Sequence, residues 1–440
     1  MEEAGTGAVT RPVPADRRHM TLDRVFWSHF SPNLGPGGWV TGVLLVHLGL
    51  SPAWGIAAIV LGNLLGAVPV ALAAVIGPVT GVPQMEASRR VLGRDGLRLP
   101  AFLNWIYCVG WDAVNNVPAA VAFTALAAWG GVPLSFAPAL AILAALQMTA
   151  SIYGHHVVQI LQKYLGAVLL AGLVAIGLLA LRDGGVPAPA ATAGWPAFVL
   201  AVAILASFNL SWASYSSDYT RYLPADTPPR AVVGRALAGL LLSSAPFQLL
   251  GLFTARAMGE GTPAAVIGGL QHAAGALGPL ALALLAMSSI TGNSFNDNTA
   301  SYSLISAGVR VGRVWAAIAT ALLGFVLAVL GHGRYAELYT SYLVVTLYWI
   351  APWTGIVLAD WWCRPGASLE AGRSWTAEAT LFVSVSVLTI VLFSSSDLYV
   401  GPVARALGGA DIGYYAGFGT AFGGTIWLSR RRNRFREVPA

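Results

Sequence analysis

The sequence is poor in charged residues, in cysteine and in lysine. Charged residues make up only 10% of the 440, whereas about 25% is usual in soluble domains, and 56% of the chain is hydrophobic. Mean hydropathy is +0.67. This balance excludes a single soluble core and indicates a protein that crosses a membrane many times. The two cysteines, Cys108 and Cys363, lie in or beside apolar runs, which excludes a disulfide framework.

Motifs of enzymes, cofactor sites and channels are missing as well. The histidines and cysteines have no spacing typical of a metal cluster, and there is no phosphate-binding or nucleophile motif. We therefore expect neither an enzyme nor a bound cofactor. A channel would carry rings of like charge or a carbonyl filter, and the sequence has neither. The N-terminus lacks an apolar region with a cleavage site, so we expect no removable signal peptide.

Long apolar stretches recur along the whole chain. A helix needs about 20 mostly apolar residues to cross the hydrocarbon core of a bilayer. Twelve stretches meet this requirement, and together they predict an all-α integral membrane protein. The predicted crossings are 25–50, 53–76, 99–126, 134–153, 156–181, 197–216, 231–254, 277–305, 313–331, 335–359, 376–393 and 411–428.

Arginine is distributed unevenly between the two sides that these crossings define. Cytoplasmic loops of membrane proteins carry an excess of Lys and Arg. With both termini in the cytoplasm, only Arg182, Arg256, Arg334 and Arg405 fall on the outer side. We therefore predict a multi-pass protein of the cell membrane with both ends cytoplasmic. The basic tail from Arg430 fits this orientation, and we expect no nucleic acid partner.

The first crossing is interrupted in its middle. Its sequence, VFWSHFSPNLGPGGWVTGVLLVHLGL, holds two prolines and three glycines between Ser31 and Gly38. Inside a helix a proline costs about 3 kcal/mol and a glycine about 1 kcal/mol relative to alanine. We predict two half-helices, with Phe30 and Ser31 at the break as candidate substrate contacts. The alternative is that these residues only kink an ordinary helix.

The sixth crossing loses its apolar character before its end. The run FVLAVAILA is followed by SFNLSWASYSSDYTRYLP, which is rich in small and polar residues. Irregular polar backbone survives at membrane depth only where it lines a cavity enclosed by protein. Interrupted helices in matching positions of two halves are typical of secondary transporters with inverted repeats, whose substrate and coupling ion bind at the breaks.

This pattern divides the chain into five parts. A cytoplasmic tail (1–24) precedes a first inverted repeat of five crossings (25–181). A second repeat (197–359) is followed by two further crossings (376–428) and a basic cytoplasmic tail (429–440). The repeats place the first and sixth crossings in equivalent positions.

The third crossing carries an aromatic and an amide side chain on one face. In NWIYCVGWDAVNNVPA, Trp111 and Asn115 are four residues apart, which is about 6 Å along a helix. An indole stacks on a flat ring, and an amide donates and accepts hydrogen bonds at the edge of that ring. The pair therefore suits a planar heterocycle. Sugars and amino acids would also accept it, and the alternative is packing between helices.

The eighth crossing is the most polar. LLAMSSITGNSFNDNTASYSLI offers hydroxyl groups at Ser288 and Ser289 and amides at Asn293 and Asn296. A sodium ion takes oxygen ligands, which these hydroxyls and the carbonyls of an unwound first helix can supply. Because Asn293 and Asn296 are three residues apart, they share a helix face, and one or both can meet a ligand. The alternative is a bundle joined by its serines.

Three ionisable side chains fall inside predicted crossings. Such residues usually face the interior of the bundle or water. Asp297 and Asp112 are candidate proton carriers, so proton coupling stands beside sodium coupling. Lys163, the only lysine, either reaches the surface or pairs with one of these two carboxylates.

Several segments resemble one transporter family. WASYSSDYTRYLP resembles the segment after the sixth helix of the nucleobase:cation symporter 1 family, most of all in its purine-cytosine permease branch. Further similar segments follow the family order over the first eight crossings, whereas the last four crossings match mainly in length. These segments are FWSHFSPNLGPGG, GNLLGAVP, GPVTGVPQMEASRRVLG, VGWDAVNN and GNSFNDNTASYS.

The resemblance implies a fold and a set of substrate contacts. The fold would be a twelve-helix LeuT-type fold with a 5+5 inverted repeat and broken first and sixth helices. In the family the ring stacks on a tryptophan at the position of Trp111 and bonds to an amide at the position of Asn115. Phe208 and Trp212 compete for the second aromatic contact, and the two amides of the eighth crossing compete for the second amide contact.

The resemblance also implies a cation site. It would use carbonyl groups near Phe26 and His29 and the hydroxyl of Ser288 or Ser289. Sodium-coupled members carry adjacent hydroxyl residues in a motif that the eighth crossing departs from, so the coupling ion is Na+ or H+. We predict import of a flat heterocycle, cytosine or a purine first. Alternatives are allantoin, hydantoin or a thiamine pyrimidine precursor, and, in another class, a membrane channel.

Overall fold

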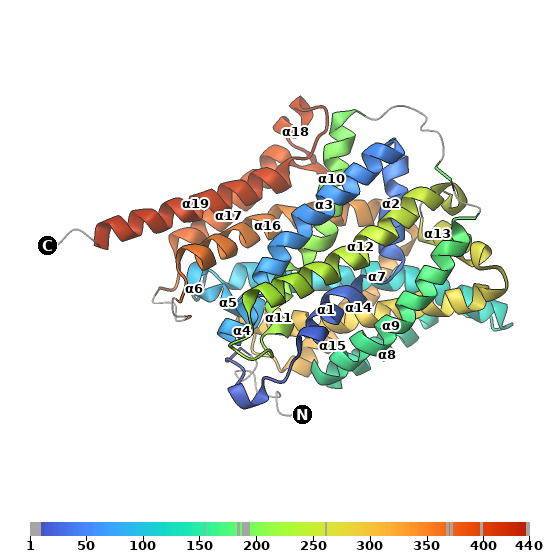
Figure 1. Ribbon diagram of the computed structural model, residues 1–440, viewed down its shortest axis with the longest axis horizontal. Coiled ribbons are helices and arrows are strands. Elements are labelled where there is room, and N and C mark those ends of the chain that lie inside the picture. Colours follow the sequence, from blue (N-terminus) through green and yellow to red (C-terminus); the bar gives the residue numbers. More distant parts are fainter. Residues whose placement is uncertain are drawn as a thin grey trace.

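The computed structural model describes residues 10–153, 155–182, 185–186, 194–259, 262–366, 369, 373–396 and 399–436. The first nine residues of the predicted cytoplasmic tail therefore lie outside the described part. The molecule is built almost wholly of helices, and the long helices lie side by side in one bundle (Figure 1). One small sheet, a pair of two-residue antiparallel strands, is the only sheet in the described residues.

The elements follow in a simple order. In the chain they are η1 (Ala15–Arg17), α1 (Leu22–Phe30), η2 (Ser31–Asn33), α2 (Pro36–His47), α3 (Pro52–Ala73), α4 (Ile76–Thr80), α5 (Gln84–Ala87), α6 (Arg89–Leu92), α7 (Arg98–Trp129), α8 (Phe136–Tyr153), α9 (His155–Ala180), α10 (Trp195–Leu210), η3 (Ser211–Ser214), α11 (Ser216–Thr220), α12 (Pro229–Met258), α13 (Pro263–Ala274), η4 (Gly275–Leu277), α14 (Gly278–Ser306), α15 (Arg313–Gly331), η5 (His332–Arg334), α16 (Tyr335–Cys363), α17 (Ala377–Phe393), β1 (Ser395–Ser396), β2 (Tyr399–Val400), α18 (Pro402–Ala406) and α19 (Gly413–Arg436).

Each of the twelve predicted crossings coincides with a helix or a pair of helices. In the described residues, 8 helical segments are long and apolar enough to cross a membrane by length and composition alone. The other four crossings differ from these for visible reasons. The first is split into α1 and α2, α7 carries the polar face of the third crossing, α17 has only 17 residues, and α19 ends in an arginine cluster.

The first crossing is broken where the prolines and glycines predict it. Helix α1 ends at Phe30, one 3-10 turn follows, and the chain is extended at Leu34 (ψ 94°) and Gly35 (φ −174°). Helix α2 then begins at Pro36, which suits a first helical position because its fixed φ is helical and its missing N–H has no partner there anyway. The prediction of two half-helices is confirmed.

The sixth crossing is interrupted differently. Helix α10 ends at Leu210, the backbone tightens to the 3-10 helix η3, and Tyr215 (φ −107°, ψ −18°) joins this turn to the short helix α11. A 3-10 segment has poorer hydrogen-bond geometry than an α-helix and often marks a functional hinge. The predicted interruption is therefore present, as a change of winding rather than as an extended stretch.

Glycines allow the helices of the core to approach closely. A Cβ atom at Gly42 on α2 would lie 2.9 Å from the Cα of Gly251 on α12, and one at Gly62 on α3 would lie 2.9 Å from the carbonyl oxygen of Val202 on α10. Small residues at such crossings bring the backbones into van der Waals contact, which is the main source of helix association in lipid. The half-helix after the first break is thus fixed against α12.

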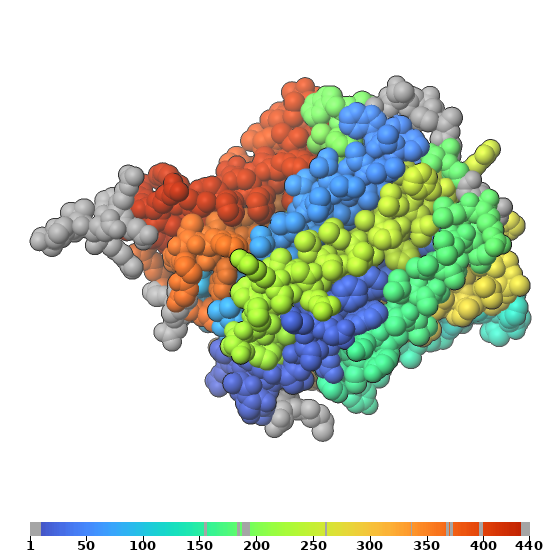
Figure 2. Space-filling view, viewed as in Figure 1, coloured from blue at the N-terminus to red at the C-terminus, as the bar shows by residue number. Residues whose placement is uncertain are grey.

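Large apolar side chains cover the outside of the bundle. Figure 2 shows α3 and α12 side by side across one face, and both expose large apolar residues, among them Trp54, Leu61 and Leu242 at 54%, 46% and 54%. A soluble protein of this size would rarely expose so continuous an apolar surface. The surface is the one expected of a bundle surrounded by lipid tails.

Candidate functional site

A cavity lies between the two interrupted crossings. It has a volume of about 50 Å³ and is walled by the first break, η3, α7, α14 and α16. Its lining residues are Pro32, Asn33, Leu34, Gly35, Pro36, Gly37, Tyr107, Trp111, Val114, Asn115, Pro118, Phe208, Ser211, Trp212, Tyr215, Ser288, Ser289, Asn296, Tyr335 and Tyr339.

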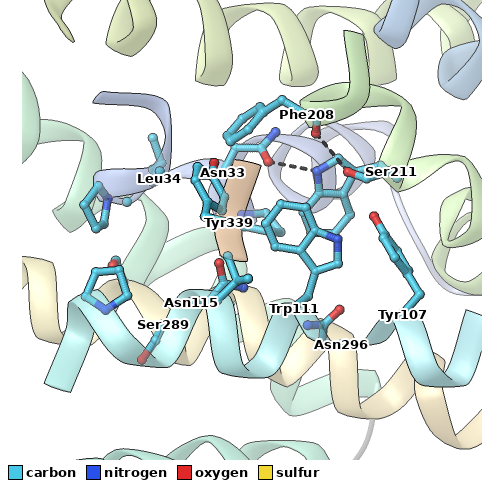
Figure 3. Close-up of a pocket in the computed structure, with 18 of the residues that line it drawn as sticks. Asn33, Leu34, Tyr107, Trp111, Asn115, Phe208, Ser211, Ser289, Asn296 and Tyr339 are labelled. Atoms are coloured by element: carbon cyan, nitrogen blue, oxygen red, sulfur yellow. Dashed lines mark hydrogen bonds between the residues drawn. The ribbon is translucent and has the colours of Figure 1, made fainter. Parts of the chain in front are cut away.

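Aromatic rings form most of the wall. Figure 3 shows Trp111 rising from α7 towards the sixth crossing, where Phe208 and Ser211 lie. Phe208 and Trp212, the two competing candidates, both line the cavity. Trp212 packs on Tyr215, with ring centroids 5.0 Å apart. A flat ligand would therefore meet aromatic faces from both repeats, which is the arrangement that favours stacking.

The first break contributes an amide that the sequence prediction missed. Asn33 accepts a hydrogen bond from the indole Nε1 of Trp212 at 2.8 Å and donates one to the hydroxyl of Ser243 at 3.1 Å. The two interrupted crossings are thereby joined beside the cavity. The signal was present in SPNLGPGG, where the prolines and glycines indicate the break but do not say that the polar residue among them turns inward.

The two candidate amides of the eighth crossing have different positions. Asn296 lines the cavity, whereas Asn293 is fully buried behind it. Asn293 accepts a hydrogen bond from Asn115 Nδ2 at 2.8 Å and donates to Gln147 Oε1 at 2.9 Å. In this way Asn293 fixes the orientation of the Asn115 amide, which faces the cavity.

Asn296 is itself held by several partners. It accepts a hydrogen bond from the Tyr215 hydroxyl and donates to the carbonyl oxygen of Cys108 at 3.3 Å and to Asp112 Oδ1 at 3.2 Å. The residue therefore stands between the cavity and a buried carboxyl group. A ligand that bonds to this amide must compete with these contacts.

Two tyrosines of α16 complete the wall and were not predicted. The rings of Tyr335 and Tyr339 stack with centroids 5.5 Å apart, and the Tyr335 hydroxyl donates to the carbonyl oxygen of Val114 at 3.1 Å. Their four-residue spacing puts both on one helix face. That spacing was a usable signal, but it lies in the last four crossings, where the resemblance gave little more than length.

Phe30 and Ser31 lie behind the cavity wall rather than in it. The Ser31 hydroxyl donates to the carbonyl oxygen of Gln162 on α9 at 2.5 Å, and the Phe30 ring stacks on Phe26 with centroids 5.0 Å apart. Neither residue is among those that line the cavity. They anchor the end of α1 to its neighbours.

The four candidate cation ligands lie on two helices, α1 and α14. The carbonyl oxygen of Phe26 and the Cβ atom of His29 would lie only 2.7 and 2.9 Å from a Cβ at Gly239, so this face of α1 packs on α12. Ser288 and Ser289 lie at the cavity, and their hydroxyl groups bond to carbonyl oxygens of their own helix at 2.7 and 3.4 Å. The cation roles of these residues stay predictions.

Lys163 has a partner at the surface. Its ammonium group lies 2.8 Å from Asp23 Oδ2, and the two side chains are 43% and 51% exposed. Of the two alternatives for this lysine, the structure has the one that reaches the surface. The buried carboxyl groups of Asp112 and Asp297 are thus not neutralised by Lys163.

Comparison with known proteins identifies the family. Residues 12–417 match the family described as permeases for cytosine/purines, uracil, thiamine and allantoin. The chain belongs to this family. The permease is 28% identical over 432 residues to a Bacillus subtilis protein provisionally named purine-cytosine permease YxlA, with 92% of each chain covered. It is 24% identical over 386 residues to purine-cytosine permease fcyB of Emericella nidulans, with 82% of the permease and 75% of fcyB covered.

Solved structures share the fold. Mhp1, a nucleobase-cation-symport-1 family transporter in a closed conformation with bromovinylhydantoin bound, matches the permease with a TM-score of 0.77 at 16% identity, covering 97% of the permease and 95% of Mhp1. The inward-facing conformation of Mhp1 gives a TM-score of 0.66. The predicted twelve-helix LeuT-type fold with inverted repeats is confirmed. Membership of a permease family likewise confirms that the protein is a transporter and not an enzyme.

Proposed function

We propose that the permease imports a nucleobase, cytosine or a purine, together with a cation by alternating access. The observation that carries this proposal is the cavity between the two interrupted crossings, where Trp111, Phe208 and Trp212 present aromatic faces and Asn115 and Asn296 present amides. In transporters with inverted repeats, substrate binds at such breaks, and the repeats move relative to each other around it.

The chemistry of the cavity favours a flat nitrogen heterocycle. Stacking of a base on an aromatic side chain contributes about 1–3 kcal/mol per base and acts on any π face. The amides discriminate among rings because each offers both a donor and an acceptor to the ring edge. Together these groups select planarity first and the pattern of ring nitrogens and exocyclic groups second.

The relatives support the same class of substrate. YxlA and fcyB are named as purine-cytosine permeases, and Mhp1 was solved with bromovinylhydantoin bound. A hydantoin is the second candidate, since it is also a flat ring with amide edges. Allantoin and a thiamine pyrimidine precursor are further candidate substrates, and a transport assay can test each of them directly.

The orientation in the membrane follows from charge. The arginine asymmetry of the loops supports a cell membrane location with both termini in the cytoplasm. Import then means movement from the outer side towards the side of α4 to α6 and the C-terminal arginines. Either Na+ or H+ drives this movement.

Reconstituted protein tests the proposed function. Proteoliposomes preloaded with unlabelled cytosine, adenine or hypoxanthine are expected to exchange it for the labelled compound, with bromovinylhydantoin tested as a competitor. Imposed gradients of sodium and of protons, each applied separately, then identify the coupling ion. Exchange of none of these rings, or net transport that ignores both gradients, would contradict the proposal.

A further inference from the structure

The structure brings two carboxyl groups together beside the cavity. Asp112 on α7 and Asp297 on α14 are both 0% exposed, and Asp112 Oδ1 accepts a hydrogen bond from Asn296, the residue that precedes Asp297 on α14. The two carboxyl groups are therefore neighbours that interact with each other. Nothing in the sequence spacing predicts this pairing, because the residues lie on different helices. Two neighbouring carboxyl groups can form a hydrogen bond to each other only when one of them carries a proton.

Each carboxyl group of the pair has one oxygen that accepts a hydrogen bond and one oxygen that can share a proton. Asp112 Oδ1 accepts from Asn296 Nδ2 at 3.2 Å, and Asp297 Oδ2 accepts from the Ser151 hydroxyl at 3.1 Å. The remaining oxygen of each carboxyl group has no N–H or hydroxyl donor among the described residues. Two neighbouring carboxylates that were both ionised would repel each other strongly where water is excluded. A proton held between them removes that repulsion.

The charged and titratable groups around the pair come from several helices. Arg313 at the start of α15 donates to the carbonyl oxygen of Ser151 at 3.0 Å and to Asn298 Oδ1 at 3.4 Å. No ion pair to Asp112 or Asp297 occurs among the residues that the structure describes. The other titratable neighbours are Tyr107 and Cys108 on α7, Tyr215 after η3, Asp218 on α11 and Tyr342 on α16.

Close packing seals the pair from water. Gly324 on α15 approaches Asp112 so closely that a Cβ atom there would lie 3.3 Å from Asp112 Oδ2. On α8, Gln147 bonds to Asn293 at 2.9 Å, which closes the side facing that helix. A buried net charge is costly, so this site favours states in which protons limit the charge of the pair.

One residue connects the pair to the cavity. Asn296 lines the cavity, its Nδ2 donates to Asp112 Oδ1, and its Oδ1 accepts from the Tyr215 hydroxyl, which also lines the cavity. A change of charge on Asp112 alters the strength with which the Asn296 amide is held. The same amide is a candidate contact for the edge of the substrate ring.

We propose that Asp112 and Asp297 form one proton-binding dyad that couples proton entry to substrate binding through Asn296. This inference rests on the proposed function and names its coupling ion as H+. With one proton the dyad carries one negative charge and holds the Asn296 amide. A second proton, taken up from the outer side, neutralises the dyad and frees that amide for the ring, and the same proton leaves to the cytoplasm after the substrate.

Transport with and without a driving gradient tests the dyad. The variants are Asp112→Asn and Asp297→Asn, with Asp411→Asn as control, since Asp411 is 2% exposed and bonds to Tyr348 and Gly413 away from the cavity. We expect both dyad variants to exchange labelled nucleobase in counterflow but to lose accumulation driven by an inward proton gradient. The control should keep both activities. Proton-driven accumulation that survives in both dyad variants would overturn the inference.

Infrared spectroscopy tests the shared proton without substrate. Wild-type protein at neutral pH should show the carbonyl stretch of a protonated carboxyl group, and this band should weaken in Asp297→Asn and in Asp112→Asn but persist in Asp411→Asn. An unchanged band in both dyad variants would overturn the dyad. Absence of counterflow in wild-type protein would instead contradict the proposed function, and the infrared result would still decide the dyad.

Discussion

The two interrupted crossings both line the cavity, but they contribute different groups to its wall. In the first, prolines and glycines leave the chain extended at Leu34 and Gly35, so backbone and the Asn33 amide reach the cavity. In the sixth, the chain stays wound as a 3-10 turn and contributes the aromatic side chains of Phe208 and Trp212. The difference assigns backbone and polar contacts to the first break and ring contacts to the sixth.

Within the two interrupted crossings, the largest expected effect comes from the indole ring of Trp212. Trp212→Ala should weaken binding of a nucleobase by about 1–3 kcal/mol, or roughly five- to a hundredfold, because it removes an aromatic face. Isothermal titration in detergent measures this. Trp315→Ala is the matched control, since Trp315 on α15 is 68% exposed. Equal affinity in the two variants would contradict the assignment of ring contacts to the sixth crossing.

The half-helix after the first break should depend on glycine for its position. Gly42→Ala should destabilise the protein by about 1–3 kcal/mol because the new Cβ atom meets the backbone of α12. Gly37→Ala, on the same half-helix, should be tolerated, since the nearest atom to its Cβ would be Phe208 Cε2 at 3.6 Å. Thermal unfolding measures the melting temperatures of both variants. Similar melting temperatures would contradict the conclusion that Gly42 fixes α2 against α12.

The hydrogen bond between the breaks has a smaller expected effect. Asn33→Ala and Trp212→Phe each remove the contact between Asn33 Oδ1 and Trp212 Nε1. In a double-mutant cycle on ligand affinity, we expect a coupling energy of about 0.5–1.5 kcal/mol. Additive effects of the two substitutions would mean that the two breaks act independently on the ligand.

Ser211 should have the smallest effect. Its hydroxyl lines the cavity but donates to the carbonyl oxygen of Phe208 within the same crossing, at 2.9 Å. Ser211→Ala should therefore change ligand affinity by less than about 0.5 kcal/mol. A large loss, measured by the same titration, would show that the sixth crossing also supplies a polar contact.

The sequence predicts those parts of the site that depend on one helix alone, but not those that depend on contacts between helices. The break at residues 31 to 38 could be predicted because proline and glycine act on their own helix. The choice between Asn293 and Asn296 could not, because it depends on which neighbours α14 meets. Asn293 turns to Gln147 on α8, and Asn296 turns to Tyr215 after η3.

The same limit explains why the carboxyl pair was not predicted as a pair. Asp112 and Asp297 were each candidates by chemistry, but their contact depends on the relative rotation of α7 and α14. In the same way, the sequence predicts the helix that carries Phe26 and His29, but not that this part of α1 packs on α12 near Gly239. Spacing along one helix fixes which residues share a face, and only the assembled bundle fixes what that face meets.

Equilibrium binding to a Trp111 variant tests the central claim most directly. Trp111 lies on α7 in the wall of the cavity that faces both breaks. Trp111→Ala should lower the affinity for cytosine or a purine by about ten- to a hundredfold through lost stacking, while Trp315→Ala binds as the wild type does. Wild-type affinity in a folded Trp111→Ala protein would contradict the claim that a flat ring stacks in this cavity.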